Sequence, residues 1–207
     1  MSRRPEIPSV ERWRAGQPSN RSRTVDESGR VARYLHPGQV LIATEPSAVT
    51  TILGSCISVC LFDPKRGIGG INHFVLPNFA GRGPTSARFG NVAVENLVDG
   101  MLETGCSRYD LRAMLFGGSH LLRGFEGPSE KSSTAELGAR NAEVARSMLE
   151  SARIAIVGED VGGRHGRKLV FFTDDGSFRV KPLQGPHGSE QHPRAAPRDR
   201  TSRWRTS

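Results

Sequence analysis

Two residues that could form a nucleophile and its base, Cys56 and His73, lie in one short apolar part of the sequence. The strand-like runs that carry them are joined by residues 63–66, where an Asp followed by a Pro suits the first two positions of a type I turn. Residues 56–76 are therefore predicted to form a β-hairpin. If its turn is centred on residues 63–66, Cys56 and His73 face each other across the two strands, with Cβ atoms roughly 4.5–5.5 Å apart. A slip of one residue in this register would place the two side chains on opposite faces.

A thiol beside an imidazole can attack acyl carbon atoms. Cysteine with its ordinary pKa of about 8.5 is mostly a thiol at neutral pH, and a neighbouring histidine can take its proton to give a strongly nucleophilic ion pair. Gly54 and Ser55 directly precede Cys56, where a glycine lets backbone N–H groups approach a developing oxyanion. Thr50 lies six residues before Cys56, and its hydroxyl could accept a hydrogen bond from the second imidazole nitrogen of His73 and fix the tautomer. The spacing is compatible with a cysteine-dependent acyl-transfer site.

The same residues are also compatible with roles outside catalysis. A cysteine on an apolar strand is more often a packed core residue, and Cys60, which shares a strand face with Cys56, is predicted to be one. A zinc site built from Cys56, Cys60 and His73 is conceivable, although zinc prefers four ligands at recognisable spacing and the sequence contains no CxxC pair. His120 and His165 are weaker alternatives as the base.

Strand-like and helix-like segments alternate around this pair and must position it. Runs rich in β-branched residues predict strands, and the apolar periodicity of residues 89–105 and 139–152 predicts two amphipathic helices. The predicted strands cover residues 39–44, 48–56, 56–63, 69–77, 111–118, 152–160, 168–177 and 177–183. Residues 120–136 are predicted to be a loop, while Gly117 and Gly118 either line a site or supply positive φ angles. The fold class is α/β (α+β): a single-domain sandwich with a mixed β-sheet, an N-terminal β-hairpin carrying the active site and two main covering helices.

Composition divides the chain into one domain and two tails. Residues 1–33 and 186–207 are rich in arginine, proline and serine and too poor in aliphatic residues to form a core, so we expect disordered basic tails. The domain between them, residues 34–185, carries 16 basic and 15 acidic residues, so most of the net charge of +8 lies in the tails and no nucleic-acid partner is expected. No apolar run approaches the roughly 18–20 residues needed to cross a bilayer. Three cysteines are too few for a disulfide framework, and a cytoplasmic protein with reduced thiols is expected.

Six short blocks follow one another in the sequence. They are GSCISVCLFD (54–63), GGINHFVLP (69–77), RFG (88–90) with the helix after it, LFGG (115–118), GARN (138–141), and EDVGG (159–163) leading to RVKPL (179–183). Their order and spacing resemble the CheD family of chemoreceptor glutamine deamidases, and the resemblance covers about residues 34–183. Several blocks in one order are far more specific than any one motif.

The resemblance implies that Cys56 is the nucleophile, His73 the general base and acid, and Thr50 the third, orienting member. It implies a hydrolase, a protein-glutamine glutaminase, that converts glutamine side chains on the cytoplasmic helices of bacterial methyl-accepting chemotaxis receptors to glutamate through a cysteine thioester, with no cofactor or metal. It also implies, in some bacteria, a regulatory complex with the CheC-type phosphatase. Two other classes must be separated from this one by experiment: another cysteine hydrolase with the same dyad, and a non-catalytic module that binds receptors or the phosphatase.

Overall fold

The strands of this chain form two five-stranded sheets. The computed structural model describes residues 24–81, 84–120, 128–183 and 200–202. In spatial order, sheet A consists of β1 (Val31–Tyr34), β3 (Ser47–Leu53), β8 (Arg167–Phe172), β9 (Phe178–Pro182) and β10 (Arg200–Ser202). Sheet B consists of β2 (Gln39–Ile42), β5 (Ile68–His73), β4 (Ile57–Asp63), β6 (Arg112–Gly117) and β7 (Ala155–Val161). Both sheets are mixed, because β1 runs parallel to β3 and β6 runs parallel to β7. The predicted α/β class is confirmed, with two sheets in place of one.

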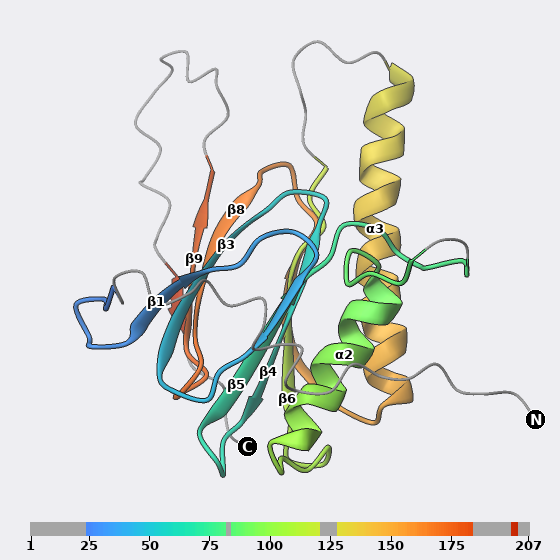
Figure 1. Cartoon of the computed structure of the whole chain (residues 1–207). Helices are drawn as coiled ribbons and strands as arrows, with labels where there is room; N and C mark the ends of the chain where they lie inside the picture. Colours follow the sequence, from blue (N-terminus) through green and yellow to red (C-terminus); the bar gives the residue numbers. More distant parts are fainter. Residues whose placement is uncertain (1–23, 82–83, 121–127, 184–199, 203–207) are drawn as a thin grey trace, which may run out of the picture.

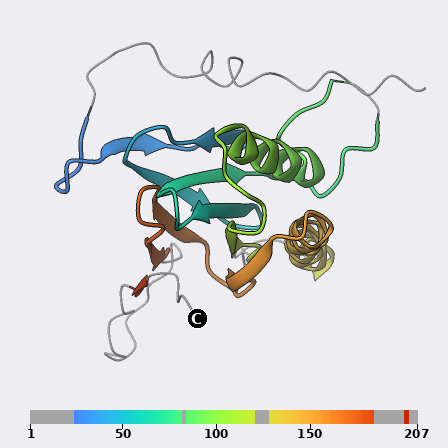
Figure 2. The ribbon, with the colours of Figure 1, turned by 90° about the horizontal axis from the view of Figure 1, so that it is seen from below.

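Sheet B lies between sheet A and two helices (Figure 1). Helix α2 (Gly90–Glu103) contacts β2, β4 and β5, and helix α3 (Pro128–Ser151) contacts β4, β6 and β7. Both helices therefore cover one face of sheet B, where Figure 2 shows them side by side. One apolar core fills the space between sheet B and the helices, and a second fills the space between the sheets. Because β4 is buried on both faces, apolar residues occupy both sets of alternating positions along it, and its sequence does not alternate between apolar and polar.

The predicted hairpin is formed by β4 and β5, but its register differs by two residues from the expected one. Asp63 pairs with Ile68, and a further bridge joins Ile57 to Phe74. The four-residue turn between the strands is centred one residue later than predicted, because Gly67, with φ of 64°, closes it by donating its N–H to the carbonyl of Asp63. A shift of two residues leaves every side chain on its predicted face.

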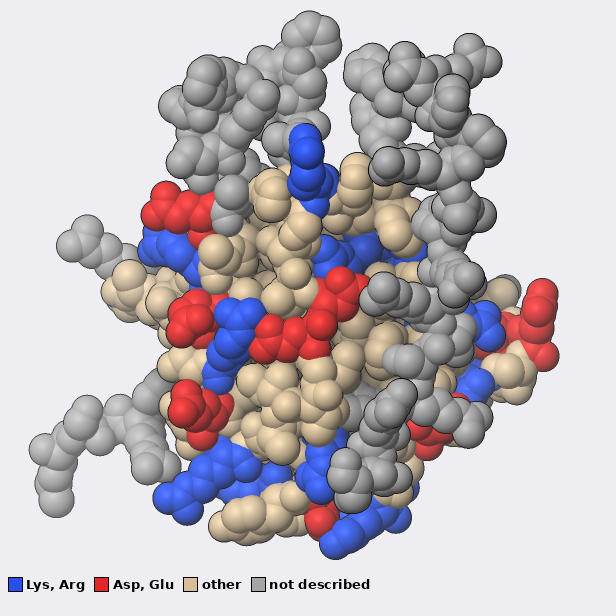
Figure 3. Space-filling model, turned by 180° about the vertical axis from the view of Figure 1, so that it is seen from behind, with Lys and Arg blue, Asp and Glu red and all other residues tan. Residues whose placement is uncertain are grey.

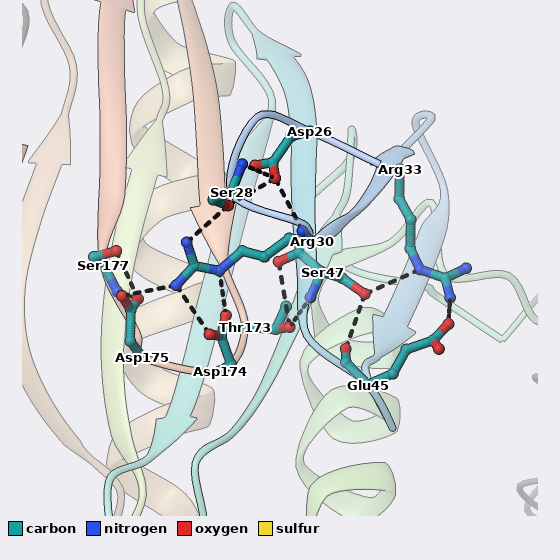
Figure 4. Close-up of polar contacts among 10 residues, drawn as sticks. All are labelled: Asp26, Ser28, Arg30, Arg33, Glu45, Ser47, Thr173, Asp174, Asp175 and Ser177. Atoms are coloured by element: carbon teal, nitrogen blue, oxygen red, sulfur yellow. Dashed lines mark hydrogen bonds and ion pairs between the residues drawn. The ribbon is translucent and has the colours of Figure 1, made fainter. Parts of the chain in front are cut away.

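The described structure includes residues 24–33, which lie on the N-terminal side of the domain boundary predicted at residue 34. The guanidinium of Arg30 bonds to Asp174 (Nε to Oδ1, 2.7 Å) and Asp175 (Nη2 to Oδ2, 3.0 Å) in the turn between β8 and β9. Figure 4 shows this cluster beside the ion pair of Arg33 with Glu45 (2.8 Å). These contacts fasten β1 and the residues before it to the turn between β8 and β9 and to the segment before β3. At the other end of the chain, β10 lies within the segment expected as a tail and pairs with β9.

Helix α3 is longer than its apolar periodicity predicts. It begins at Pro128 and so includes part of segment 120–136, which was predicted to be a loop. Proline is favoured in the first helical turn because its fixed φ and missing N–H are both compatible with it, and the polar residues that follow hide this part of the helix from an analysis of apolar periodicity. The rest of the predicted loop, residues 121–127, lies outside the described residues, as do residues 1–23, 186–199 and 203–207 of the predicted tails.

Charged side chains of both signs are interspersed over the face of the molecule shown in Figure 3. One ion pair joins the helical layer to the edge of sheet B, with Arg146 Nη2 2.7 Å from Glu159 Oε2. Within the described ranges, no helix is long and apolar enough to cross a membrane.

Candidate functional site

Cys56 lies where the chain passes from sheet A to sheet B. Residues 54–56 join β3 to β4 and are only partly buried, whereas β4 is fully buried. The carbonyl groups of residues 54, 55 and 56 accept hydrogen bonds from the N–H of Ser119 (2.8 Å), the side-chain amide of Asn141 (3.0 Å) and the N–H of Gly118 (2.8 Å), respectively. Three successive carbonyls thus anchor the loop of residues 54–56 to the end of β6 and to α3.

This anchoring directs the N–H groups of Ser55 and Cys56 away from β6 and α3. In a planar trans peptide the C=O and N–H bonds point in opposite directions, so a carbonyl held on one side implies an N–H directed to the other. The N–H of Cys56 faces its own sulfur. In the described part of the chain neither N–H bonds to another residue's acceptor. Ser55 and Cys56 are therefore the candidate oxyanion donors, while Gly54 contributes its carbonyl to the anchoring.

His73 ends β5 and its imidazole is buried between the two sheets, with 2% of the residue exposed. Its Nδ1 lies 2.8 Å from Oγ1 of Thr51 in β3, and that hydroxyl donates its proton to the carbonyl of Leu35 (2.9 Å). Because a hydroxyl has one proton, Thr51 accepts the hydrogen bond from the imidazole. Nδ1 therefore carries the ring proton and Nε2 holds a lone pair, as a base requires. Nε2 is buried and has no hydrogen-bond partner among the described residues.

The contact predicted for Thr50 is made instead by Thr51. Successive side chains of a strand point to opposite faces, and the face of β3 that meets the core between the sheets carries Val49, Thr51 and Leu53, all of them buried. Thr50 lies on the other face of β3 and is only partly buried. Distance along the sequence from Cys56 does not settle which of two adjacent threonines faces inward.

Cys56 and His73 lie on the same face of the hairpin as diagonal neighbours. Reciprocal hydrogen bonds between Ile57 and Phe74, of 3.1 and 3.0 Å, fix the register beside both residues. Val75 therefore lies opposite Cys56, and His73 is two residues away on the same face. Diagonal neighbours across two strands are roughly 7–8 Å apart, within reach of a long side chain such as imidazole. The structure thus places the predicted pair on one face of the hairpin as diagonal neighbours, not in the directly opposed arrangement expected, and Nε2 of His73 makes no hydrogen bond to Sγ of Cys56.

Burial favours the neutral form of both groups. Burial raises the pKa of the Cys56 thiol, and the N–H of Cys56 and the charge of Arg88 only partly offset this effect. Burial also lowers the pKa of His73, to about 4. In the free protein at neutral pH the pair is therefore a thiol and a neutral imidazole, whereas an ion pair was expected from the sequence. A neutral imidazole with a free lone pair on Nε2 has the protonation state that a general base needs.

Glycines at the end of β6 allow the loop of residues 54–56 to pack closely. Gly117 and Gly118 have φ angles of 112° and 66°, which confirms the prediction that they supply positive φ. A Cβ on Gly117 would lie 2.1 Å from the carbonyl oxygen of Cys56. A Cβ on Gly138 in α3 would lie 2.5 Å from the carbonyl oxygen of Gly118. These close contacts hold the loop, the end of β6 and α3 together.

The remaining cysteine and histidine candidates lie apart from this arrangement. Cys60 is fully buried in the core between the sheets, as predicted, and burial raises its pKa well above the ordinary value. His165 is exposed in the turn before β8, and His120 bonds through its N–H to the carbonyl of Gly163. In the ranges that the structure describes, no cluster of His, Cys, Asp and Glu side chains could hold a metal ion.

Three residues of the site were missed from the sequence. Thr51 and Asn141 contact the dyad or its neighbours through the fold, and Arg88 adds a positive charge that acts on Cys56. The Cγ of Arg88 lies only 2.7 Å from where a Cβ of Gly38 would be, so the side chain packs on the segment before β2. Their only signal in the sequence was that Arg88 and Asn141 fall within the RFG and GARN blocks.

The fold and the site define a class of protein: a two-sheet α/β protein in which an anchored cysteine and a buried histidine share one face of a hairpin. A family model described as CheD chemotactic sensory transduction matches residues 75–182. This range begins after His73, so the roles of Cys56 and His73 rest on their geometry.

Three similar proteins bear the name "Probable chemoreceptor glutamine deamidase". The one from Anaeromyxobacter dehalogenans, CheD 1, is 45% identical over 155 residues, which cover 75% of this chain and 86% of that protein. The one from Trichlorobacter lovleyi is 41% identical (69% and 85% covered), and the one from Sulfurimonas denitrificans is 36% identical (73% and 94%). The chain belongs to the CheD family. Among solved structures, the Bacillus licheniformis hypothetical protein YfiH matches at 15% identity with a TM-score of 0.39, covering 58% of this chain and 49% of that one, a similarity too weak to carry an argument.

Proposed function

We propose that this chain is a protein-glutamine deamidase that converts glutamine side chains of chemoreceptors to glutamate, with Cys56 as nucleophile and His73 as base. One observation carries the proposal: Thr51 holds Nδ1 of the imidazole, which leaves the lone pair of Nε2 available to a thiol on the same face of the hairpin. The substrate class is taken from the names of the relatives, which describe chemoreceptor glutamine deamidases.

In the proposed reaction, His73 Nε2 takes the thiol proton while Sγ of Cys56 attacks the amide carbon of the glutamine side chain. The N–H groups of Ser55 and Cys56 bind the developing oxyanion. His73 then donates the proton to the leaving nitrogen, ammonia departs and a thioester remains on Cys56. A water molecule, deprotonated by His73, attacks the thioester, the C–S bond breaks, and the thiol is restored. Thr51 keeps the ring in the required tautomer throughout.

The proposed protein substrate is the set of cytoplasmic helices of methyl-accepting chemotaxis receptors, so the proposed location is the bacterial cytoplasm. A CheC-type phosphatase is proposed as a second, regulatory partner. The reaction as written needs no cofactor, because protein groups and water supply every proton and nucleophile. Calorimetric titration of the protein with a CheC-type phosphatase measures binding of this partner directly, and so tests it separately from the receptor.

Ammonia release from a receptor cytoplasmic fragment tests the enzymatic proposal. The wild-type protein should release ammonia, Cys56→Ala should not, and Cys60→Ala should retain most of the activity. An unrelated glutamine-rich peptide separates a receptor-directed deamidase from a general cysteine hydrolase, which would act on both substrates. A folded wild-type protein that binds the receptor fragment and releases no ammonia would be a binding module, and the proposal would then be wrong.

A further inference from the structure

The hairpin ladder that carries Cys56 and His73 is weak on both sides of them. Beyond the bridge next to the pair the ladder ends, because the N–H of Val75 bonds to the carbonyl of the loop before α2 (2.9 Å). On the other side, the N–H of Val59 donates to the side-chain Oδ1 of Asn72 (2.8 Å), and regular pairing resumes only beyond it. Backbone pairing alone therefore gives limited control over the separation of nucleophile and base.

One buried side chain closes this gap from outside the sheet. Asn141 in α3 is completely buried, and its Nδ2 donates to the carbonyl of Ser55 (3.0 Å) and to the carbonyl of Val75 (2.9 Å). Ser55 directly precedes Cys56, and Val75 follows His73 by two residues. Because both Nδ2 protons are used, the amide plane fixes how far apart the two carbonyls lie.

The same contact sets the orientation of the peptide between Ser55 and Cys56. Its carbonyl is bonded to Asn141, and its N–H faces the Cys56 sulfur, where an oxyanion would form. Helix α3 is itself a firm support, since Gly138 packs on Gly118 at a distance that excludes any side chain.

We propose that Asn141 is a positioning residue for this reaction, one that holds the Cys56 and His73 segments at a fixed separation and orients the Ser55–Cys56 peptide. The expected effect of Asn141 on kcat rests on the proposed deamidase function, whereas its effect on the positions of Cys56 and His73 does not. Asparagine is suited to the role because its NH₂ group offers two donors in one plane. Aspartate would place an acceptor against two carbonyls, and serine could reach at most one of them.

The test compares Asn141→Ala with a matched control on the same helix. Arg146→Ala removes the ion pair that ties α3 to β7, and so loosens the helix without touching the Ser55 or Val75 carbonyls. Small misplacements of reacting groups can cost about 10²-fold in rate, so Asn141→Ala should lower kcat by about 10- to 10²-fold while KM stays within about twofold. Arg146→Ala should lower the melting temperature and leave kcat unchanged. If Asn141→Ala does not fold, Asn141→Ser, which keeps one donor, should give a smaller loss in kcat.

A second measurement needs no substrate and separates the failure of this inference from that of the proposed function. Alkylation of Cys56 by iodoacetamide at neutral pH should be slower in Asn141→Ala and in His73→Asn than in wild type, and the double variant should be little slower than His73→Asn alone. If the wild-type protein has no deamidase activity, the proposed function is wrong. The comparison of alkylation rates in the two single variants and the double variant would still decide the role of Asn141. Three results would overturn the inference. Asn141→Ala could keep the wild-type kcat and alkylation rate, Arg146→Ala could lose as much kcat as Asn141→Ala, or the effects of the two substitutions on alkylation could multiply fully in the double variant.

Discussion

Replacing His73 with asparagine should flatten the dependence of protein stability on acid pH. The folded-state pKa of His73 is lowered to about 4 from 6.5, and the side chain is almost completely buried. As the pH falls below 6.5, the unfolded chain binds a proton that the folded protein excludes, so stability that is present above pH 6.5 is lost as the pH falls toward 4. The full interval corresponds to about 3 kcal/mol, of which about 2 kcal/mol is lost between about pH 7 and about pH 5. Asparagine does not titrate, and its amide can still donate to Thr51.

Urea denaturation of wild type and His73→Asn at several pH values measures this difference. Both tryptophans, Trp13 and Trp204, lie outside the described residues, so far-UV circular dichroism is the better probe of unfolding. Carboxylates titrate in both proteins and cancel in the comparison, and a constant offset from the lost side chain does not affect the slope. The wild type should lose about 2 kcal/mol more than the variant between about pH 7 and about pH 5. Parallel stability curves would show that His73 is not held neutral by burial.

The remaining predictions concern the hydroxyl of Thr51, the thiols of Cys56 and Cys60, and Gly117. In a steady-state ammonia assay, Thr51→Val should lower kcat by about 10-fold or more, and Thr51→Ser should partly restore it. Thr50→Val should keep kcat within about twofold of wild type. Equal losses at both positions would show that Thr51 does not orient the imidazole. Mass mapping after brief treatment with iodoacetamide should find Cys56 modified and Cys60 unmodified, because the second thiol is fully buried and its pKa lies well above the ordinary value. Gly117→Ala should destabilise the protein by about 2 kcal/mol or more, because φ is 112° and the new Cβ would meet a carbonyl 2.1 Å away; a melting temperature equal to that of wild type would refute this packing.

Periodicity and turn chemistry in the sequence were sufficient for the fold class and most elements. The largely apolar strand β4, the helix before Gly105 and the hairpin of β4 and β5 all follow from local patterns, because each depends on residues that are neighbours in the chain. The start of α3 did not, since its first turns carry polar residues with no apolar period. The division of the strands into two sheets was also beyond reach, because strand partners are chosen by contacts between distant segments.

In the candidate site, too, local patterns predicted what lies within one hairpin but not the contacts made by distant segments. Cys56 and His73 could be paired from the sequence because they belong to one hairpin, and an error of two residues in the register preserved their common face. Thr51 was missed by one residue, which is enough to reverse the face of a strand. Asn141 reaches the loop from a helix 86 residues away in sequence, and no local pattern predicts such a contact.

Incubation of a receptor cytoplasmic fragment with the protein in heavy-oxygen water, followed by peptide mass mapping, tests the central claim most directly. Wild type should convert specific glutamines to glutamates that carry the heavy oxygen, since the thioester on Cys56 is hydrolysed by solvent water. Cys56→Ala, folded to the same melting temperature, should leave every glutamine unchanged. Conversion of the same glutamines by Cys56→Ala at the wild-type rate would contradict the account.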